Sequence, residues 1–255
     1  MSRPVAIVLA AGKGTRMHSD LPKVLHPVGG SPMVVRVLTA VRDAGISAAV
    51  VVTGYGAETI REAVGHASRL LDPLRISYAY QATQRGTGDA VRVGVEGLDQ
   101  EDRAVIVPGD TPLLEGGVLR SLLEQHRDGV ALTLVAARVA NPFGYGRIVR
   151  EGLRVTAIVE QRDASLEQQR ITEVNTGVMC AQVGLFRQLL PLCRSDNAQS
   201  EILLTDIVGI LAERGEMVQS MLVGDPDVVV GVNDPASLAR CEAIVASRGH
   251  GTGSG

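Results

Sequence analysis

The sequence predicts an α/β fold in which helices cover both faces of a mostly parallel, mixed sheet. Through the first half of the chain, short apolar runs typical of buried strands alternate with segments in which apolar residues recur at helical spacing. The connections are short, and strands joined through helices in this way lie parallel in one sheet. The composition agrees, because 45% apolar and 21% charged residues are typical of a globular protein with a well-buried core.

The expected elements of the first half follow from these patterns in order. Strands are predicted at 5–9, 48–53, 75–80 and 104–107, and helices between Ser31 and Gly45, at 57–64 and at 88–98. Ser31 is expected to cap the first helix, with Pro32 at its first helical position and Gly45 closing it.

After Gly129 the pattern changes to strand-like runs joined by turns. Strands are expected at 130–139, 146–149, 155–160 and 173–180, helices at 183–192 and 202–214, strands at 217–223 and 227–232, and a final helix at about 235–247. The strand-rich part predicts a mixed extension of the sheet, which is the usual place for a second substrate.

The composition excludes several classes of function. A formal net charge of −3 with no Trp, two Phe and four Tyr gives neither the basic surface nor the stacking residues of a nucleic-acid-binding protein. No apolar run approaches the roughly 18 residues of a membrane helix, and the run at 5–11 is better explained as a strand than as a signal peptide. Three widely spaced cysteines without metal-ligand spacing are typical of a reduced, cytoplasmic protein.

The loop after the first strand is the most informative passage. Gly12 and Gly14 allow backbone N–H groups to approach an anion closely, and Arg16 and Lys23 supply positive charge beside them. Several phosphates in a row are the anion that best suits such a loop. The loop lacks the third glycine of the dinucleotide fingerprint and the Gly-Lys-Ser/Thr ending of the P-loop. A tight strand-to-helix turn with two solvated surface cations therefore stays open as an alternative.

Polar residues also follow the third and fourth predicted strands. Ligands in an open parallel sheet sit at the carboxyl ends of the strands, so these loops and the glycine loop should converge on one crevice. Asp110 is placed to hold Mg²⁺, and Asn233 offers a second oxygen ligand, although a turn cap explains either residue as simply. Gln81 and the pair Gly86-Thr87 suit a base edge and a ribose, although the pair equally suits a helix start.

Taken together, these segments resemble the sugar nucleotidyltransferases, and among them the uridyltransferase domain of the bifunctional N-acetylglucosamine-1-phosphate uridyltransferases. The segments that carry the resemblance are 9–17 (LAAGKGTRM), 21–26 (LPKVLH), Gln81 with 86–90 (GTGDA), 108–114 (PGDTPLL), 142–148 (PFGYGRI), 158–161 (IVEQ), 173–177 (EVNTG), 197–201 (NAQSE) and 231–233 (GVN). They occur in family order between residue 5 and about residue 240. The resemblance implies a Rossmann-like three-layer α/β/α nucleotidyltransferase (GT-A-like) domain at 1–248 and a flexible Gly-rich tail at 249–255. Within the domain it implies a nucleotide-binding part at about 1–115 and a sugar-binding part at about 116–235.

The resemblance also implies a role for each matched residue. The residues implied to bind the nucleotide are Leu9, Ala10, Ala11, Gly12, Gly14, Lys23, Gln81, Gly86 and Thr87. Arg16 and Lys23 are implied to be catalytic, and Asp110 and Asn233 to bind Mg²⁺. The residues implied to bind the sugar phosphate are Gly146, Glu160, Asn175 and Thr87. The implied substrates are UTP and N-acetylglucosamine 1-phosphate, for the synthesis of cell-wall precursors in the cytoplasm. Glu160 is not expected to be a general base, because the sugar phosphate is already an anionic nucleophile at neutral pH.

Several alternatives stay open at this stage. A transferase that uses dTTP, CTP or another sugar 1-phosphate differs from the uridyltransferase by only a few contacts in the loops that begin at Leu9 and Gln81. A nucleotide-sensing domain without catalysis is a further alternative, although such domains usually lose a cation or the metal carboxylate. Full-length family members continue into a β-helix of hexapeptide repeats that carries acetyltransferase activity and mediates trimerisation. No hexapeptide repeat is visible in this sequence, so acetyltransferase activity is not assigned to it. Whether the sequence is part of a longer bifunctional protein or a stand-alone uridyltransferase is left open, as is a homo-oligomer.

Overall fold

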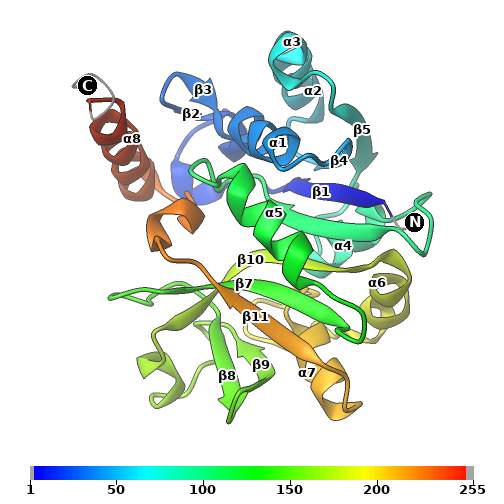
Figure 1. Cartoon of the computed structure of the whole chain (residues 1–255). Coiled ribbons are helices and arrows are strands. Elements are labelled where there is room, and N and C mark those ends of the chain that lie inside the picture. The colour runs from blue at the N-terminus through cyan, green and yellow to red at the C-terminus, as the bar shows by residue number, and fades with distance from the viewer. Residues whose placement is uncertain (1–2, 251–255) are drawn as a thin grey trace.

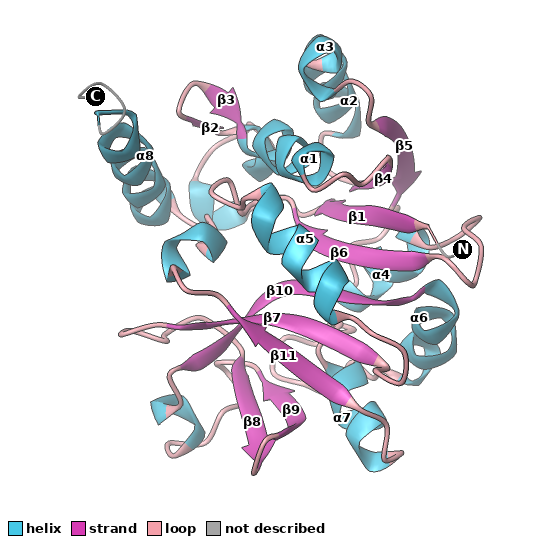
Figure 2. Cartoon of the chain, in the orientation of Figure 1, coloured by secondary structure: helices cyan, strands magenta, loops and turns pink. Residues whose placement is uncertain are grey.

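The fold, in a computed structural model that describes residues 3–250, is built on a nine-stranded sheet (Figures 1 and 2). The strands run in the order β11-β7-β10-β6-β1-β4-β5, and β8 pairs with β10 on one side and with β9 on the other. Their bounds are β1 (Pro4–Ala10), β4 (Ala48–Thr53), β5 (Arg75–Tyr80), β6 (Arg103–Pro108), β7 (Leu132–Arg138), β8 (Arg147–Glu151), β9 (Arg154–Val159), β10 (Glu173–Gln182) and β11 (Val218–Leu222). A separate small hairpin pairs β2 (Pro27–Val28) with β3 (Ser31–Pro32).

Helices cover both faces of this sheet, as the alternation of elements predicts. They are α1 (Met33–Asp43), α2 (Ala57–His66), α3 (Ser68–Leu71), α4 (Thr87–Gly94), α5 (Gly116–Gln125), α6 (Val183–Leu189), α7 (Asp206–Glu213) and α8 (Pro235–His250). Successive residues of β1 point to opposite faces: Val8 packs in a core with α1 and α5, and Ile7 in a core with α4 and α6. The three-layer α/β/α arrangement is therefore confirmed.

Strand direction divides the sheet into two parts. β1, β4, β5 and β6 are mutually parallel, whereas β10 runs antiparallel to β6, β7 and β8. The register places Leu9 beside Pro108, Ala10 beside Thr53, and Thr53 beside Tyr80. Because these residues all lie at the carboxyl ends of their strands, the loops that follow β1, β5 and β6 leave the sheet at the same edge.

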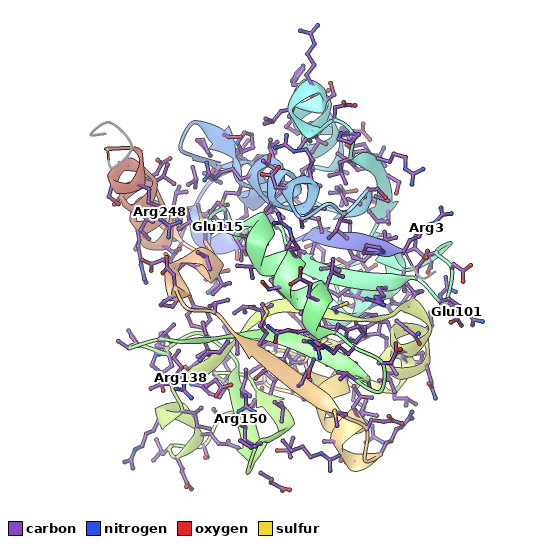
Figure 3. All side chains as sticks on the ribbon, viewed as in Figure 1. Arg3, Glu101, Glu115, Arg138, Arg150 and Arg248 are labelled. Carbon is purple, nitrogen blue, oxygen red and sulfur yellow. The ribbon has the colours of Figure 1, made fainter. Side chains whose placement is uncertain are left out.

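A third, smaller core brings the C-terminal part of the chain to this edge. Met17 from the glycine loop packs with Val232 and with Cys241 of α8. Arg248 of α8 also forms an ion pair of 3.3 Å with Glu115, which precedes α5 (Figure 3). Within residues 3–250, no helix combines the length and the apolar character that a membrane crossing needs.

The structure corrects five details of the expected elements. Ser31 lies in β3 and Pro32 is the N-cap residue of α1, so the helix begins one residue later than expected. The strand expected at 227–232 is absent, and Pro226–Val229 forms a 3-10 helix. Helix α7 begins at Asp206, later than expected, and α5 was not predicted. Helix α8 runs to His250, within the expected tail, and residues 251–255 lie outside the described residues.

Candidate active site

The glycine loop leaves β1 at Ala10 and passes directly over the stem of Lys23. Gly14 has a φ of 69°, and a Cβ at this position would overlap Lys23 Cβ. Lys23 itself begins a 3-10 helix, Lys23–Leu25, whose Val24 and Leu25 are buried. The absence of a side chain at Gly14 thus allows the loop and the lysine to pack against each other.

At the mouth of this loop, two cationic side chains meet two side chains with acceptor oxygens that are distant from them in sequence. Lys23 Nζ donates hydrogen bonds to Asp110 Oδ2 and, at 3.1 Å, to Asn233 Oδ1. Arg16 Nη2 donates to the same Asn233 oxygen at 3.1 Å. The Lys23 and Asp110 side chains are only 17% and 16% exposed. The structure therefore brings together the four residues that the sequence analysis assigned to catalysis and to the metal.

Asn233 owes its position to the residues on either side of it. The backbone N–H of Val232 donates to the carbonyl of Asp110 at 2.8 Å, so the segment before α8 lies against the loop after β6. Asp234, not Asn233, caps α8: its Oδ1 accepts from the Ser237 N–H at 2.8 Å. Hydrogen bonds from Ser237 hold the pKa of Asp234 below its usual value. The amide of Asn233 is thus left to face the cations.

The Asp110 and Asn233 pair has the chemistry of a magnesium site. Their oxygens accept hydrogen bonds from one ammonium group, so both already point at a single positive charge. Within residues 3–250, no group of three or more His, Cys, Asp or Glu side chains is arranged to hold a metal. A carboxylate oxygen and an amide oxygen nevertheless fit Mg²⁺, because proteins commonly hold this ion with few side chains while phosphate oxygens and waters complete its coordination.

A cavity of about 220 Å³ opens between the loops that follow β1, β5 and β6. Its lining includes Leu9, Ala10, Ala11, Gly12, Lys23, Gln81, Gly86, Thr87 and Asp110, together with Val24, Gln84, Ala90 and Glu201. Gly14 and Arg16 are not among the lining residues. The convergence expected from the strand ends is confirmed.

Gly86 and Thr87 lie both at a helix start and on the cavity wall. Gly86 is the N-cap residue of α4 with a φ of 115°, and a Cβ there would lie 2.5 Å from the carbonyl oxygen of Ile202. Thr87 Oγ1 accepts a hydrogen bond from the Leu204 N–H at 3.0 Å. The helix start is therefore confirmed, whereas binding of a base or ribose by these two residues stays a prediction. The segment 202–204 is fixed against the cavity.

Three of the four residues assigned to the sugar phosphate, all except Thr87, form a second cluster. The carbonyl of Gly146 accepts from the Asn175 N–H at 2.8 Å. A Cβ at Gly146 would lie 3.3 Å from Glu160 Oε1 and 2.9 Å from Ile158 Cγ2, so the glycine leaves room for the carboxylate. The residue before β8, the residue after β9 and Asn175 of β10 therefore share one small region.

A bulge in β10 connects this cluster to the first one. The register of β10 against β7 shifts between Asn175 and Met179. Within the bulge, Gly177 has a φ of 79° and faces Pro108, to whose Cγ a Cβ would come within 2.8 Å. Pro108 ends β6 two residues before Asp110, so the bulge, which begins at Asn175, packs against the strand that leads to the candidate metal ligand.

Glu160 is held as a partly buried carboxylate. Burial raises its pKa, the carboxylates of Asp163 and Asp206 add to the rise, and a 3.0 Å hydrogen bond from Thr205 Oγ1 and the charge of Arg147 oppose it. Arg147 is itself only 1% exposed and donates to Gln161 Oε1 at 2.6 Å. The charge and position of Glu160 are thus set by Arg147 inside the β8–β9 hairpin and by residues outside it, namely Asp163, Thr205 and Asp206.

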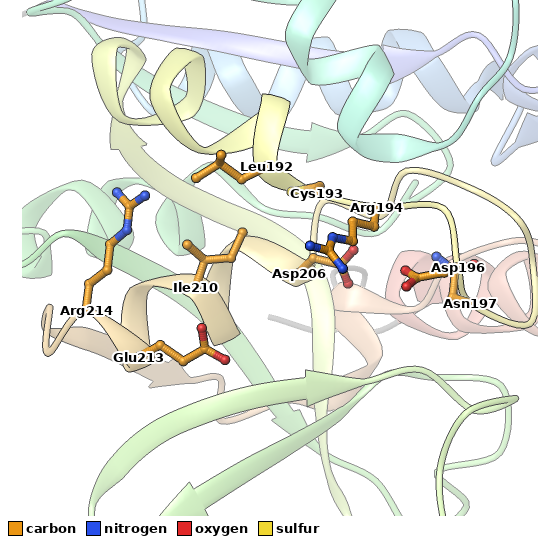
Figure 4. Close-up of a pocket in the computed structure, with 9 residues that line it drawn as sticks. All are labelled: Leu192, Cys193, Arg194, Asp196, Asn197, Asp206, Ile210, Glu213 and Arg214. Atoms are coloured by element: carbon orange, nitrogen blue, oxygen red, sulfur yellow. The ribbon is translucent and has the colours of Figure 1, made fainter.

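A larger cavity of about 540 Å³ lies elsewhere, beside α7 (Figure 4). It is lined by Leu192, Cys193, Arg194, Asp196, Asn197, Asp206, Ile210, Glu213 and Arg214. None of the sequence-predicted site residues lines it. Cavity size alone would therefore point away from the chemistry, and the smaller crevice is the candidate active site because charge and hydrogen-bond donors converge there.

Several residues of the site were not predicted from the sequence, and three of them form hydrogen bonds there. Gln84 lines the cavity and donates to the carbonyl of Ala11 at 2.8 Å. Asp89, which is 2% exposed, accepts a hydrogen bond from Gln81 at 2.9 Å, and Thr205 holds Glu160. Asp89 lies inside the 86–90 segment, where a carboxylate beside two arginines was the available signal. No comparable pattern marks Gln84 or Thr205.

A family model described as the MobA-like NTP transferase domain matches residues 6–174, which run from within β1 to the start of β10. The chain belongs to this family. The NTP transferase match contains the glycine loop, Lys23, Asp110 and Glu160, whereas Asn233 lies beyond it. Two solved structures have the same fold. One is a putative glucose-1-phosphate thymidylyltransferase from Bacillus anthracis, 20% identical, with a TM-score of 0.75 over 94% of each chain. The other is a UDP-glucose pyrophosphorylase, 17% identical, with a TM-score of 0.77 over 97% of this chain and 100% of that one.

Curated relatives of this NTP transferase carry the name bifunctional protein GlmU. The one from Carboxydothermus hydrogenoformans is 44% identical over 236 residues, which are 92% of this chain and 51% of the relative. The one from Pelobacter propionicus is 44% identical over 251 residues, 97% of this chain and 53% of the relative. The chain thus spans about half the length of the curated relatives it matches. The family resemblance seen in the sequence segments is confirmed.

Proposed function

We propose that this protein transfers the uridylyl group of UTP to N-acetyl-α-D-glucosamine 1-phosphate, giving UDP-N-acetylglucosamine and pyrophosphate. The observation that carries the proposal is the position of Lys23, which bridges Asp110 and Asn233 at the mouth of the cavity. Similarity to proteins named GlmU over more than nine-tenths of the chain supports the choice of substrates.

The proposed reaction is a direct phosphoryl-type transfer. A phosphate oxygen of the sugar phosphate attacks the α-phosphorus of UTP, the bond from that phosphorus to the bridging oxygen of the β-phosphate breaks, and pyrophosphate leaves. Both reactants are anions, so the site has to reduce their repulsion and hold them in line. Arg16 and Lys23 supply the positive charge, while the backbone of the glycine loop fixes the nucleotide.

Asp110 and Asn233 would hold Mg²⁺ in this site. When bound, the ion would neutralise charge on the phosphates. Gly146, Glu160 and Asn175 would hold the sugar hydroxyls and the N-acetyl group, with Thr87 between the two substrates. No proton has to be removed from the attacking oxygen, so Glu160 acts as a hydrogen-bond acceptor and not as a base.

The proposal also includes the cellular compartment of the reaction and the use of its product. The cysteines Cys180, Cys193 and Cys241 are free thiols, which supports a reduced, cytoplasmic location. There the product would serve as a precursor for the cell wall. The division into a nucleotide part at about 1–115 and a sugar part at about 116–235 stays a prediction, and a homo-oligomer stays an open alternative.

The test is an assay of pyrophosphate release with UTP, N-acetylglucosamine 1-phosphate and Mg²⁺, with EDTA as the control. Parallel reactions with dTTP and CTP, and with other sugar 1-phosphates, measure the selectivity. We expect the highest kcat/KM for UTP with the N-acetylated sugar, and loss of turnover in EDTA. A preference for another pair of substrates would replace the proposal, and binding of UTP without turnover would favour a nucleotide-sensing domain.

A further inference from the structure

Gln81 and Asp89 form a buried hydrogen-bonded pair behind the cavity. Gln81 directly follows β5 and is 4% exposed, and Asp89 lies in the first turn of α4 and is 2% exposed. Gln81 Nε2 donates to Asp89 Oδ2 at 2.9 Å and to the carbonyl of Gly86 at 3.2 Å. Both N–H groups of the Gln81 amide are therefore used inside the protein.

Two arginines keep Asp89 in its charged form. Arg85 Nη2 and Arg92 Nη2 donate to Asp89 Oδ1 at 2.9 and 3.0 Å. Burial by itself would raise the pKa of Asp89, but the hydrogen bonds from Gln81, Arg92 and Arg85 outweigh it and leave the pKa below its usual value. The carboxylate and the Gly86 carbonyl can only accept hydrogen bonds.

This arrangement fixes which way the Gln81 amide points. If the amide were reversed, its oxygen would face two acceptor oxygens and the hydrogen bonds would be lost. The amide oxygen Oε1 is consequently the atom that Gln81 can offer to the cavity that it lines. A fixed acceptor in a nucleotide site can distinguish a base whose ring nitrogen N3 carries a hydrogen from a base whose N3 does not.

We propose that Asp89 is a positioning residue for base selection, which holds Gln81 Oε1 as an acceptor for the N3–H of uracil. The proposal rests on the proposed function, in which this cavity holds the base of UTP. Cytosine has an acceptor at N3, so it would place two unpaired acceptors against each other. Sites that pair a polar group with the correct ligand reject the unpaired ligand strongly.

The decisive variant is Asp89→Asn. Its amide oxygen can still accept from Arg85 and Arg92, which leaves the amide nitrogen facing Gln81 and favours the reversed Gln81 amide. We expect the ratio of kcat/KM for UTP to that for CTP to fall about tenfold or more, mainly through the KM of the two nucleotides. A purely structural role would lower kcat/KM for both nucleotides equally and leave the ratio unchanged.

Glu96→Gln is the matched control. Glu96 also pairs with Arg92, at 3.0 Å, but its side chain is 67% exposed and lies away from Gln81. The control should keep the wild-type ratio. A second variant, Gln81→Met, should lower the ratio by itself, and adding Asp89→Asn to it should change the ratio no further.

The outcomes separate this inference from the proposed function. If the wild-type protein releases no pyrophosphate from UTP and N-acetylglucosamine 1-phosphate, the proposed function fails and the inference fails with it. If the wild type is active and folded Asp89→Asn keeps the full ratio, only the inference is overturned. Should Asp89→Asn not fold, an unchanged ratio in Gln81→Met overturns it equally.

Discussion

The nucleotide part and the sugar part of the site are held in place in different ways. Around the glycine loop, parallel strands and closely packed glycines fix the backbone, and Lys23, Asp110 and Asn233 bond directly to one another. Glu160 depends instead on Thr205 and Arg147, and its hairpin β8–β9 joins β10 at a single register pair, Val174 with Arg147. The charged groups of the nucleotide part thus lie at the ends of the central parallel strands, while the sugar part is carried by a hairpin that packs against α7 and has one register pair with β10.

The largest effect is expected from Lys23→Ala. It removes the ammonium that bridges Asp110 and Asn233, and a lost preorganised electrostatic contact typically costs ~10²–10³ in turnover. Because the side chain is partly exposed, the fold should be retained. Arg16→Ala should act in the same direction. The measurement is kcat for pyrophosphate release, with circular dichroism as the check on folding.

Lys13→Ala is the control for this change. Lys13 is exposed on the same loop and faces the ring of Tyr55 at 5.3 Å, away from the bridge. It should keep nearly all activity. Near wild-type turnover in both Lys23→Ala and Arg16→Ala would contradict the assignment of charge screening to the nucleotide part.

A smaller and more selective effect is expected from Glu160→Gln. The amide keeps the size of the side chain but weakens its hydrogen bonds to a bound sugar, and bonds to charged groups contribute about 1.5–3 kcal/mol. We expect KM for N-acetylglucosamine 1-phosphate to rise roughly 10–100-fold and KM for UTP to stay near its wild-type value. Glu151→Gln, at the exposed end of β8, is the control. Equal increases in both KM values would show that the two parts of the site are not separable in this way.

Arg147→Met tests the attachment of the hairpin. The substitution removes the hydrogen bonds of a buried guanidinium to Gln161 Oε1 and to the carbonyl of Tyr145. We expect the free energy of unfolding to fall by about 1–3 kcal/mol, and KM for the sugar phosphate to rise several-fold. Thermal unfolding and steady-state kinetics measure these two effects. Leu153→Ser changes a side chain that is 96% exposed between β8 and β9, and it should show neither effect. An unchanged sugar KM in Arg147→Met would contradict the link between the hairpin and sugar binding.

The sequence predicted the parallel part of the fold more fully than the rest, for a physical reason. Buried parallel strands are short apolar runs and their helices are amphipathic, so each leaves a local signal. Helix α5 was missed because it opens with Gly116 and Gly117, which disfavour helix. The structure shows why glycine is needed: a Cβ at Gly116 would lie 2.8 Å from the backbone of Asp43. The run Val228–Val230 is buried by tertiary packing, and burial alone does not distinguish a strand from a 3-10 helix.

The same contrast applies to the site. Arg16, Lys23, Asp110 and Gln81 follow strand ends, so topology alone placed them near one crevice. The meeting of Asn233 with Lys23 depends on more than 200 intervening residues. The residue pattern offered Asn233 only as a candidate ligand with a turn cap as the alternative, and the family resemblance decided between them. The roles of Thr205 and Arg147 depend on a hydrogen bond and a burial that no spacing in the sequence encodes.

The smallest expected effect is a pH dependence confined to the sugar part. Burial raises the pKa of Glu160. As the pH falls, its carboxylate therefore takes up a proton before an ordinary glutamate does, whose pKa is about 4.3. The protonated group accepts hydrogen bonds less well, so KM for the sugar phosphate should rise as the pH is lowered through the raised pKa. KM for UTP should not follow it, because Glu160 is outside the nucleotide cavity. In Glu160→Gln this rise in sugar KM should disappear. A general base would instead lower kcat at saturating sugar phosphate over the same pH range, and that result would assign Glu160 to the chemistry and overturn its role as a hydrogen-bond acceptor.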